Sequence, residues 1–221
     1  MIVAIDGPAA SGKSTVARAL ARRLGFAYLD TGAMYRAASH VALRRGVPLD
    51  DADRLGALAA SVDVRFEGEE GDPVPLRVFA DGEDVTALIR APAVDAAVSA
   101  VARIPLVRAA MVAQQRAATG ASDTVVEGRD IGTVVFPDAA VKVFLTASSE
   151  ERARRRQVDL SDAGHEIDEA DVRERLDSRD AADSARETSP LAVAEDAVIL
   201  DTTGLSIEQV VERIASLVRE A

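Results

Sequence analysis

The first 24 residues combine an apolar run, a glycine-rich turn and an amphipathic stretch. Residues 2–5 read Ile-Val-Ala-Ile, which is typical of a buried parallel strand. Residues 7–14 read Gly-Pro-Ala-Ala-Ser-Gly-Lys-Ser and match the pattern Gly-x-x-x-x-Gly-Lys-[Ser/Thr] of a phosphate-binding loop. The next residues place apolar side chains on one helical face, namely Val16, Leu20 and Leu24. Strand, loop and helix in this order predict an α/β chain that binds a phosphate group.

The residue types in this loop suit a nucleoside triphosphate. Gly7 and Gly12 let the backbone fold tightly enough to aim several N–H groups at one anion, and the helix N-terminus adds partial positive charge. Lys13 would reach the β- and γ-phosphates, and the Ser14 hydroxyl would bind Mg²⁺. The alternative is an incidental glycine-rich turn. The loop residues expected to hold the triphosphate are Gly7, Pro8, Ala9, Ala10, Ser11, Gly12, Lys13, Ser14 and Thr15.

Composition limits the partners of the chain. Apolar residues make up 48% of the 221 positions, as in an ordinary globular protein, and aromatic residues only 3%. The absence of cysteine excludes disulfides and thiolate metal sites and suits a reducing compartment, so we expect a cytoplasmic protein. No apolar run has membrane-spanning length, and the N-terminus does not resemble a signal peptide. The net charge of −11 argues against a nucleic-acid polymer as partner. We expect a monomer, because no exposed apolar stripe requires a partner.

Buried strands alternate with helical patterns along most of the chain. The expected strands lie near 2–5, 27–29, 124–127, 141–145 and 197–201. Helical patterns cover 31–45, 50–61, 92–102, 105–119, a segment from the capping box Ser148-x-x-Glu151 through Arg156, and a last segment after the capping box Ser206-x-x-Gln209. Residues 157–189 are highly charged and carry few apolar residues. This alternation predicts a doubly wound parallel sheet, whose ligands bind at the carboxyl ends of the strands.

In residues 62–86, apolar side chains recur with a different period from the rest of the chain. Residues 62–66 and 76–80 alternate apolar and polar side chains, as half-buried strands do. Asp81-Gly82 is a good hairpin turn before a third short strand at 84–86. The sequence therefore predicts a small antiparallel β insertion.

Arginines concentrate in two places. Arg36 and Arg129 follow strand ends, beside the segments Asp30–Arg36 and Glu127–Asp130, which we expect to share a crevice with the phosphate-binding loop. A second group comprises Arg152, Arg154, Arg155, Arg156, Arg173, Arg175, Arg179 and Arg186. A solvated helix face is the favoured interpretation for Arg154 or Arg173 alone. So many cations favour phosphoryl transfer between two nucleotides, which needs charge neutralisation, over a hydrolytic switch.

Four motifs together resemble the bacterial cytidylate kinases. They are Gly7–Thr15, Leu29–Arg36, Glu127–Pro137 and Ser148–Arg152, and the resemblance extends over essentially the whole chain. It implies the P-loop kinase fold with a helical lid. It also implies transfer of the γ-phosphoryl group of MgATP to CMP or dCMP, within pyrimidine nucleotide metabolism.

The resemblance also assigns roles to residues. Thr31 and Arg36 would line the sugar-phosphate region, and Ser99, Arg108 and Asp130 the base pocket. The residues implied to contact ATP or the acceptor from other segments are Arg129 at the acceptor phosphate, Arg152 at ATP, and Arg179, Asp183 and Arg186 from the lid. Lys13, Arg129, Arg179 and Arg186 would be catalytic. Two departures stand out: Thr31 replaces a serine found in some members, and Ala182 lies where some relatives carry arginine.

The implied base pocket makes chemical sense for cytosine. A carboxylate such as Asp130 accepts from the N4 amino group, and a guanidinium such as Arg108 donates to N3 and O2. Uracil reverses this pattern at positions 3 and 4 and would leave buried polar groups without partners. The alternative for Asp130 is an ion pair with Arg129 or a turn cap.

The expected organisation is a single kinase chain with three parts. They are a core at about 1–30, 106–147 and 190–221, a monophosphate-binding arm at about 31–105, and a lid at about 148–186. One alternative is a kinase for another nucleoside monophosphate or small metabolite. A nucleotide-dependent switch is the other, but the guanine-binding pattern Asn-Lys-x-Asp is absent from the sequence.

Overall fold

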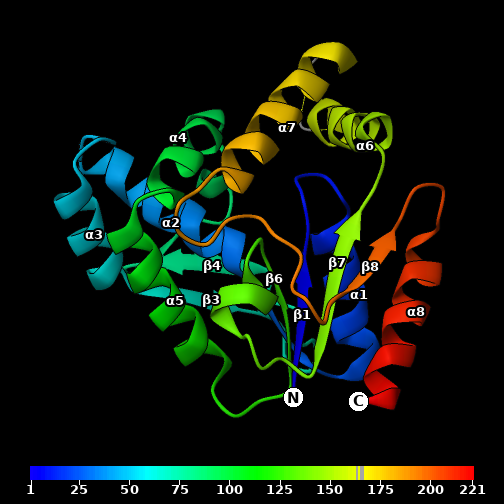
Figure 1. Cartoon of the computed structure of the whole chain (residues 1–221). Helices are drawn as coiled ribbons and strands as arrows, with labels where there is room; N and C mark the ends of the chain where they lie inside the picture. Colours follow the sequence, from blue (N-terminus) through cyan, green and yellow to red (C-terminus); the bar gives the residue numbers. More distant parts are fainter. Residues whose placement is uncertain (163, 165–166) are drawn as a thin grey trace. The chain divides into compact units, whose positions relative to one another are not determined.

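The computed structural model describes residues 1–162, 164 and 167–221. Five strands form one sheet in the order β2-β6-β1-β7-β8, and three form a second sheet in the order β3-β4-β5. The predicted α/β class is therefore confirmed, as is the small antiparallel insertion. Figure 1 follows the chain from its N-terminus in blue to its C-terminus in red.

The chain divides into two units, of which the first comprises Met1–Leu20 and Glu127–Ala221. Its strands are β1 (Ile2–Asp6), β7 (Val141–Thr146) and β8 (Val198–Asp201), and its helical segments are η2 (Ile131–Val135), α6 (Ser149–Asp162), α7 (Glu169–Ser184), α8 (Ile207–Glu220) and the start of α1 (Lys13–Leu24). In parallel register, Val3 of β1 lies opposite Val141, and Val143 opposite Val198. The arrows of these three strands point the same way, and α6 and α7 lie beyond their tips (Figure 1).

Strands β1 and β7 are buried because their apolar side chains meet helices on the faces of the sheet, whereas Val198 and Ile199 of the edge strand β8 are exposed. Val3, Ile5 and Leu145 are fully buried, and so is Ile214 on α8. The predicted capping box opens α8: the Ser206 hydroxyl accepts from the Gln209 N–H, and the Gln209 side chain accepts from the Ser206 N–H. The packed helices hold the sheet in place, and the phosphate-binding loop begins at the carboxyl end of its strand β1.

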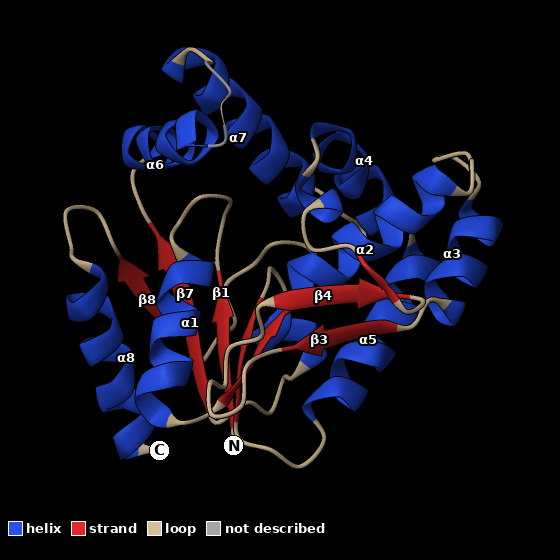
Figure 2. Cartoon of the chain, turned by 180° about the vertical axis from the view of Figure 1, so that it is seen from behind, coloured by secondary structure: helices blue, strands red, loops and turns tan. Residues whose placement is uncertain are grey.

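The second unit is Ala21–Val126. Its elements are β2 (Ala27–Asp30), α2 (Thr31–Arg44), α3 (Ala52–Ser61), β3 (Val64–Glu67), β4 (Arg77–Ala80), β5 (Glu83–Asp84), η1 (Leu88–Arg90), α4 (Pro92–Ala102), α5 (Pro105–Thr119) and most of β6 (Thr124–Glu127). Helix α3 packs against α5, and α2 against α4. Figure 2 shows β3 and β4 as an antiparallel pair. The predicted turn joins β4 to β5, with φ of 51° at Asp81 and 82° at Gly82.

The lid is helical, as the resemblance implied, but one helix is longer than predicted and a second was not placed from its own pattern. Helix α6 continues past Arg156 to Asp162, and the charged segment 157–189 contains α7. The reason is that α7 needs only a narrow apolar stripe, in which Val172 and Leu176 are buried against Ala153 of α6. The part of the predicted lid at residues 163, 165 and 166 lies outside the described residues.

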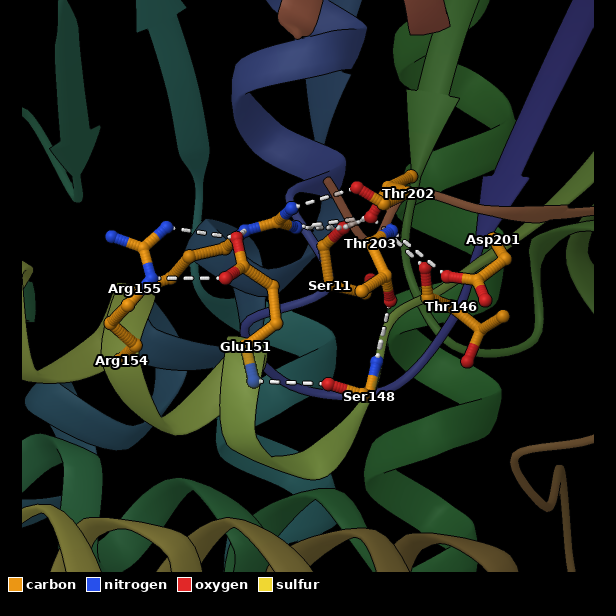
Figure 3. Close-up of polar contacts among 9 residues, drawn as sticks. All are labelled: Ser11, Thr146, Ser148, Glu151, Arg154, Arg155, Asp201, Thr202 and Thr203. Atoms are coloured by element: carbon orange, nitrogen blue, oxygen red, sulfur yellow. Dashed lines mark hydrogen bonds and ion pairs between the residues drawn. The ribbon is translucent and has the colours of Figure 1, made fainter. Parts of the chain in front are cut away.

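The capping box predicted at the start of α6 is only half formed. The Ser148 hydroxyl accepts from the Glu151 N–H at 3.2 Å, but the Ser148 N–H donates to Thr203 Oγ1 at 2.9 Å (Figure 3). The Glu151 carboxylate instead accepts from Arg154 and Arg155. Its two hydrogen-bonding arginines, Arg154 first, hold the pKa of Glu151 below its usual range.

Among the described residues, no single helix is long and apolar enough to cross a membrane. The pair α4 and α5 passes that test only when taken together, across a bend of 101°.

Candidate active site

The phosphate-binding loop lies between β1 and α1, as predicted. Gly7 has a φ of 147°, and a Cβ there would lie 2.0 Å from the Leu145 carbonyl oxygen of β7. Only glycine lets the loop leave β1 this close to β7. Lys13 is 5% exposed, and its ammonium donates to the Pro8 carbonyl at 2.6 Å and to Ser11 Oγ at 3.3 Å. Burial, followed by the charge of Arg129, holds the pKa of Lys13 well below its usual value.

The Ser14 hydroxyl contacts a carboxylate that was not among the predicted site residues. Its hydroxyl donates to Glu127 Oε2 at 2.8 Å, and Glu127 is buried at the end of β6. A hydroxyl and a carboxylate are oxygen ligands of the kind that Mg²⁺ takes. The signal in the sequence was the position of Glu127 directly at a strand end, the same signal that drew attention to Arg129.

A second carboxylate, Asp6, fixes the loop after β6. Its two oxygens accept from the N–H groups of Ile131 at 2.8 Å and Gly132 at 2.7 Å, at the start of the π-helical turn η2. Burial raises the pKa of Asp6 to about 6, although these two hydrogen bonds oppose the shift. Asp130, which the sequence placed in the base pocket, precedes this turn and is itself buried. Asp6 therefore fixes the backbone conformation of Ile131 and Gly132, directly after Asp130.

Three of the predicted lid and loop residues form one ion-pair group. Asp183 of α7 is 2% exposed and accepts from Arg129 Nε at 3.2 Å and from the Arg186 guanidinium. A buried carboxylate between two guanidiniums holds both cations in fixed positions. Arg179 lies one turn earlier on the same helix and is half-buried.

Arg152 is held by the backbone of the phosphate-binding loop and by α7. Its guanidinium donates to the Ala9 carbonyl at 3.1 Å, to Asp177 at 3.2 Å and to Asp180. Asp180 also accepts from the Ala9 N–H at 2.9 Å. The structure therefore places this arginine against the loop itself, which the sequence could not specify.

In the second unit, the start of α2 carries Thr31 and Arg36. Asp30 caps the helix by accepting from the Ala33 N–H at 2.8 Å, and its other oxygen accepts from Arg36 at 3.1 Å. Thr31 is buried and Arg36 half-buried. A Cβ on Gly32 would lie 3.1 Å from the Arg36 guanidinium, so glycine leaves room for this ion pair.

The same unit holds the two remaining predicted base-pocket residues. Arg108 of α5 is 3% exposed, donates to the Ala102 carbonyl at 3.1 Å, and lies 5.5 Å from the centre of the Tyr35 ring. Contact with an aromatic face suits a guanidinium better than an ammonium. Ser99 is half-buried on α4.

The predicted residues are thus distributed over the two units. The first brings together Lys13, Ser14, Arg129, Asp130, Arg152, Arg179, Asp183 and Arg186. Thr15 of the same unit is exposed on α1. The second contains Thr31, Arg36, Ser99 and Arg108. That both sets face one crevice stays a prediction.

The part of the chain that the structure describes contains no group of three His, Cys, Asp or Glu side chains able to hold a metal ion. A divalent cation at Ser14 and Glu127 would take its other ligands from phosphate oxygens and water.

A parallel sheet whose first strand runs into a glycine-rich loop and a helix, with a buried lysine in that loop, defines a P-loop nucleotide-binding protein. The family model for cytidylate kinase matches residues 3–220. This chain belongs to the cytidylate kinase family.

Individual relatives agree with the family match. The chain is 51% identical over 215 residues to the cytidylate kinase of Desulfitobacterium hafniense, covering 97% of this chain and 91% of the relative. It is 52% identical over 217 residues to that of Pelotomaculum thermopropionicum, covering 98% and 95%. A solved structure of an uncharacterised protein from Eubacterium ventriosum matches the whole chain and 99% of its own with a TM-score of 0.52 at 11% identity, which supports the fold alone.

Proposed function

We propose that this chain catalyses transfer of the γ-phosphoryl group of MgATP to CMP or dCMP, giving CDP or dCDP and ADP. The observation that carries the proposal is identity of about half the residues to cytidylate kinases over nearly the full chain. The buried Lys13 in its loop and the guanidiniums of Arg129 and Arg186 supply the charges that such a reaction needs.

The loop would bind ATP through backbone N–H groups and Lys13. The ammonium donates to Pro8 and Ser11, and phosphate oxygens would take the place of these acceptors when ATP binds. Negative charge at that point favours the protonated lysine, so ATP binding would raise its depressed pKa. We expect Arg152 to contribute through its hold on the Ala9 carbonyl.

Ser14 and Glu127 fit a Mg²⁺ ion because both present oxygen ligands and lie 2.8 Å apart. When bound with ATP, Mg²⁺ would neutralise charge on the phosphate oxygens. Glu127 would orient the Ser14 hydroxyl, since the two are hydrogen-bonded already.

Transfer itself requires the cations around Asp183. Arg129 would neutralise the acceptor phosphate, and Arg179 and Arg186 would stabilise the charge spread over the transferring group. Asp183 keeps Arg129 and Arg186 in place, and each guanidinium carries five N–H donors with which to bind phosphate oxygens. No general base is required, because the acceptor phosphate is already largely ionised at neutral pH.

Selection of the acceptor would depend on the second unit and on Asp130. We propose that Thr31 and Arg36 contact the sugar and phosphate, and that Ser99, Arg108 and Asp130 bind cytosine. The Ala102 carbonyl and the Tyr35 ring fix the orientation of the Arg108 guanidinium. A donor with a fixed orientation can distinguish two bases by the positions of their acceptor atoms. The pattern of donors and acceptors favours cytosine over uracil.

A panel of acceptors tests this proposal. Purified protein with MgATP is given CMP, dCMP, UMP, AMP, dTMP or shikimate, and ADP formation is followed in a coupled assay. We expect the highest kcat/KM with CMP or dCMP. A higher value with another acceptor would contradict the proposal and favour a kinase for a different metabolite.

We also propose that the protein acts as a cytoplasmic monomer in pyrimidine nucleotide metabolism, with small nucleotides and not nucleic acids or membranes as partners. Its acidic net charge of −11 and lack of cysteine support this. Light scattering after size-exclusion chromatography would give a mass near 23.2 kDa for a monomer.

A further inference from the structure

Arg155 of α6 lies across the phosphate-binding loop, although no motif assigned it a role there. Its Nη1 donates to the Ser11 carbonyl at 3.3 Å and to Thr202 Oγ1 at 3.0 Å, and its Nη2 donates to the Thr202 carbonyl at 3.0 Å. Figure 3 shows the guanidinium reaching Ser11 and Thr202 from one side and Glu151 from the other. One side chain thus joins α6, the loop and the end of β8.

The guanidinium is itself held at both ends. Glu151 Oε1 accepts from Arg155 Nε at 2.7 Å. Thr202 is 2% exposed, and its N–H donates to the Thr146 carbonyl of β7 at 2.8 Å. Arg155 therefore connects the Ser11 carbonyl to the edge of the sheet through residues that have little freedom to move.

Fixing the Ser11 carbonyl has a geometric consequence for the next residue. The carbonyl of Ser11 and the N–H of Gly12 belong to one planar trans peptide group, so they point in opposite directions. When Arg155 draws the carbonyl toward α6, the Gly12 N–H is turned away from α6. Gly12 has a φ of 91°, a left-handed conformation that helps successive N–H groups converge on an anion.

The same relation holds one turn earlier on α6. Arg152 donates to the Ala9 carbonyl, which turns the N–H of Ala10 in the opposite direction, and Ala10 has a φ of 58°. Two arginines three residues apart on α6 thus hold the carbonyls of Ala9 and Ser11, two residues apart in the loop. Arg154, between them, is exposed and pairs with Glu151 (Figure 3).

We propose that Arg155 is a positioning residue for ATP: by holding the Ser11 carbonyl against the end of β8, it aims the Gly12 N–H at the phosphates. The inference rests on the proposed function, since ATP is taken as the ligand of the loop. Arg155 acts through the peptide group and needs no contact with the nucleotide.

Three substitutions separate geometry from charge. R155A removes the contacts with Ser11 and Thr202 and also the charge. R155K keeps the charge, but a single ammonium cannot span the Ser11 and Thr202 oxygens as a guanidinium does. T202V keeps the shape of Thr202 but removes its hydroxyl, which accepts from Arg155 at 3.0 Å and itself donates to the Ser11 carbonyl at 3.3 Å, so it tests the shared hold on that carbonyl. The matched control is R154A, which removes a neighbouring arginine that shares Glu151 with Arg155 and leaves the Arg155 contacts with Ser11 and Thr202 in place.

We expect R155A and R155K each to weaken binding of Mg-AMPPNP, measured by calorimetry, about tenfold, which is the worth of one hydrogen bond to a charged group. T202V should weaken it about threefold. The dissociation constant for CMP and the melting temperature should change little in R155K, and R154A should behave as wild type. In ¹⁵N NMR spectra, the Gly12 amide should shift less on nucleotide binding in R155K than in wild type.

Wild-type binding of Mg-AMPPNP by R155K would overturn the inference, because charge alone would then suffice. Equal loss of affinity for both nucleotides would also overturn it, because that result indicates general damage to the fold. If R155A does not fold, R155K decides the question, because T202V also removes the direct contact of Thr202 with the Ser11 carbonyl. If wild type and R154A make no CDP, the proposed function fails instead, whatever R155K does.

Discussion

At the scale of single residues, the buried ammonium of Lys13 costs stability. Lys13 is held among backbone and hydroxyl oxygens, and burial with the nearby Arg129 disfavours its protonated form. The unfolded chain therefore binds this proton more tightly than the folded chain does. A residue that weakens the fold in this way is retained for function, and phosphate is the ligand that would compensate it.

Replacement of Lys13 by methionine tests this trade-off. K13M removes the buried ammonium and keeps an unbranched side chain of similar length. We expect kcat to fall by about 10²–10³-fold, as when one group that stabilises transition-state charge is lost. We expect the melting temperature to equal or exceed that of wild type, and CMP affinity to change little. Unchanged kcat in K13M would contradict the phosphate role of Lys13.

Asp6 makes stability depend on pH. Its pKa is about 6 in the fold against 3.8 for an ordinary Asp, so its contribution to stability is full below pH 4 and is lost as pH rises through 6. Between pH 4 and pH 7, wild type should lose about 2 kcal/mol of unfolding free energy relative to D6N. Urea unfolding of both proteins across this range measures the difference. Parallel pH profiles would contradict the raised pKa.

Motifs in the sequence identify some of the site residues. They do not reveal residues that belong to the site only through contacts with distant parts of the chain. Lys13 and Ser14 were predictable because their spacing in the loop is fixed by the phosphate. The contacts of Glu127 and Arg155 with the loop were not, because these residues lie 113 and 144 residues along the chain from their partners Ser14 and Ser11. Only the fold brings such residues into contact, and a lone arginine on a charged helix is more often solvated.

At the scale of elements, α7 organises the cations of the first unit. One face of this helix packs Val172 and Leu176, and its C-terminal half carries Asp180 and Asp183. Asp180 contacts the phosphate-binding loop, whereas Asp183 pairs with Arg129 and Arg186. The spacing of three residues places these two carboxylates about one turn apart on the helix.

Removal of Asp183 should damage this arrangement. D183A leaves Arg129 and Arg186 without their shared carboxylate, so we expect a loss of about 3 kcal/mol in unfolding free energy. The KM for CMP should rise about tenfold, because the two cations repel each other and leave their positions. The control D177A, which removes an exposed carboxylate from the same helix, should cost less than about 1 kcal/mol. Equal stability of D183A and D177A would contradict this account.

Most elements could be predicted because their periods are clear. The parallel strands are continuous apolar runs, and Asp81-Gly82 has the residues that a two-residue hairpin requires. The resemblance implied a helical lid, but the bounds of α7 could not be predicted from its own pattern, because two buried apolar residues among many charges give almost no helical stripe. The half-formed capping box at Ser148 has a similar cause, since Thr203, far along the chain, takes the N–H that Glu151 would have bound.

At the scale of the whole molecule, we propose that a lid at about residues 148–186 and an arm at about 31–105 close over both nucleotides. Closure would exclude water, which would otherwise accept the phosphoryl group. Amide hydrogen exchange with Mg-AMPPNP and CMP together should slow in α6 and α7 more than with either alone, while α8 stays unchanged as an internal control. Identical exchange in α6 and α7 with and without the nucleotides would rule out the closure.

The fate of the γ-phosphoryl group tests the central claim most directly. Wild-type protein is mixed with magnesium, CMP and ATP that carries a label on its γ-phosphate, and the products are separated. We predict that the label appears in CDP, with one ADP formed for each CDP, and that K13M forms almost none. Release of the label as inorganic phosphate, or failure to label CDP, would contradict the account.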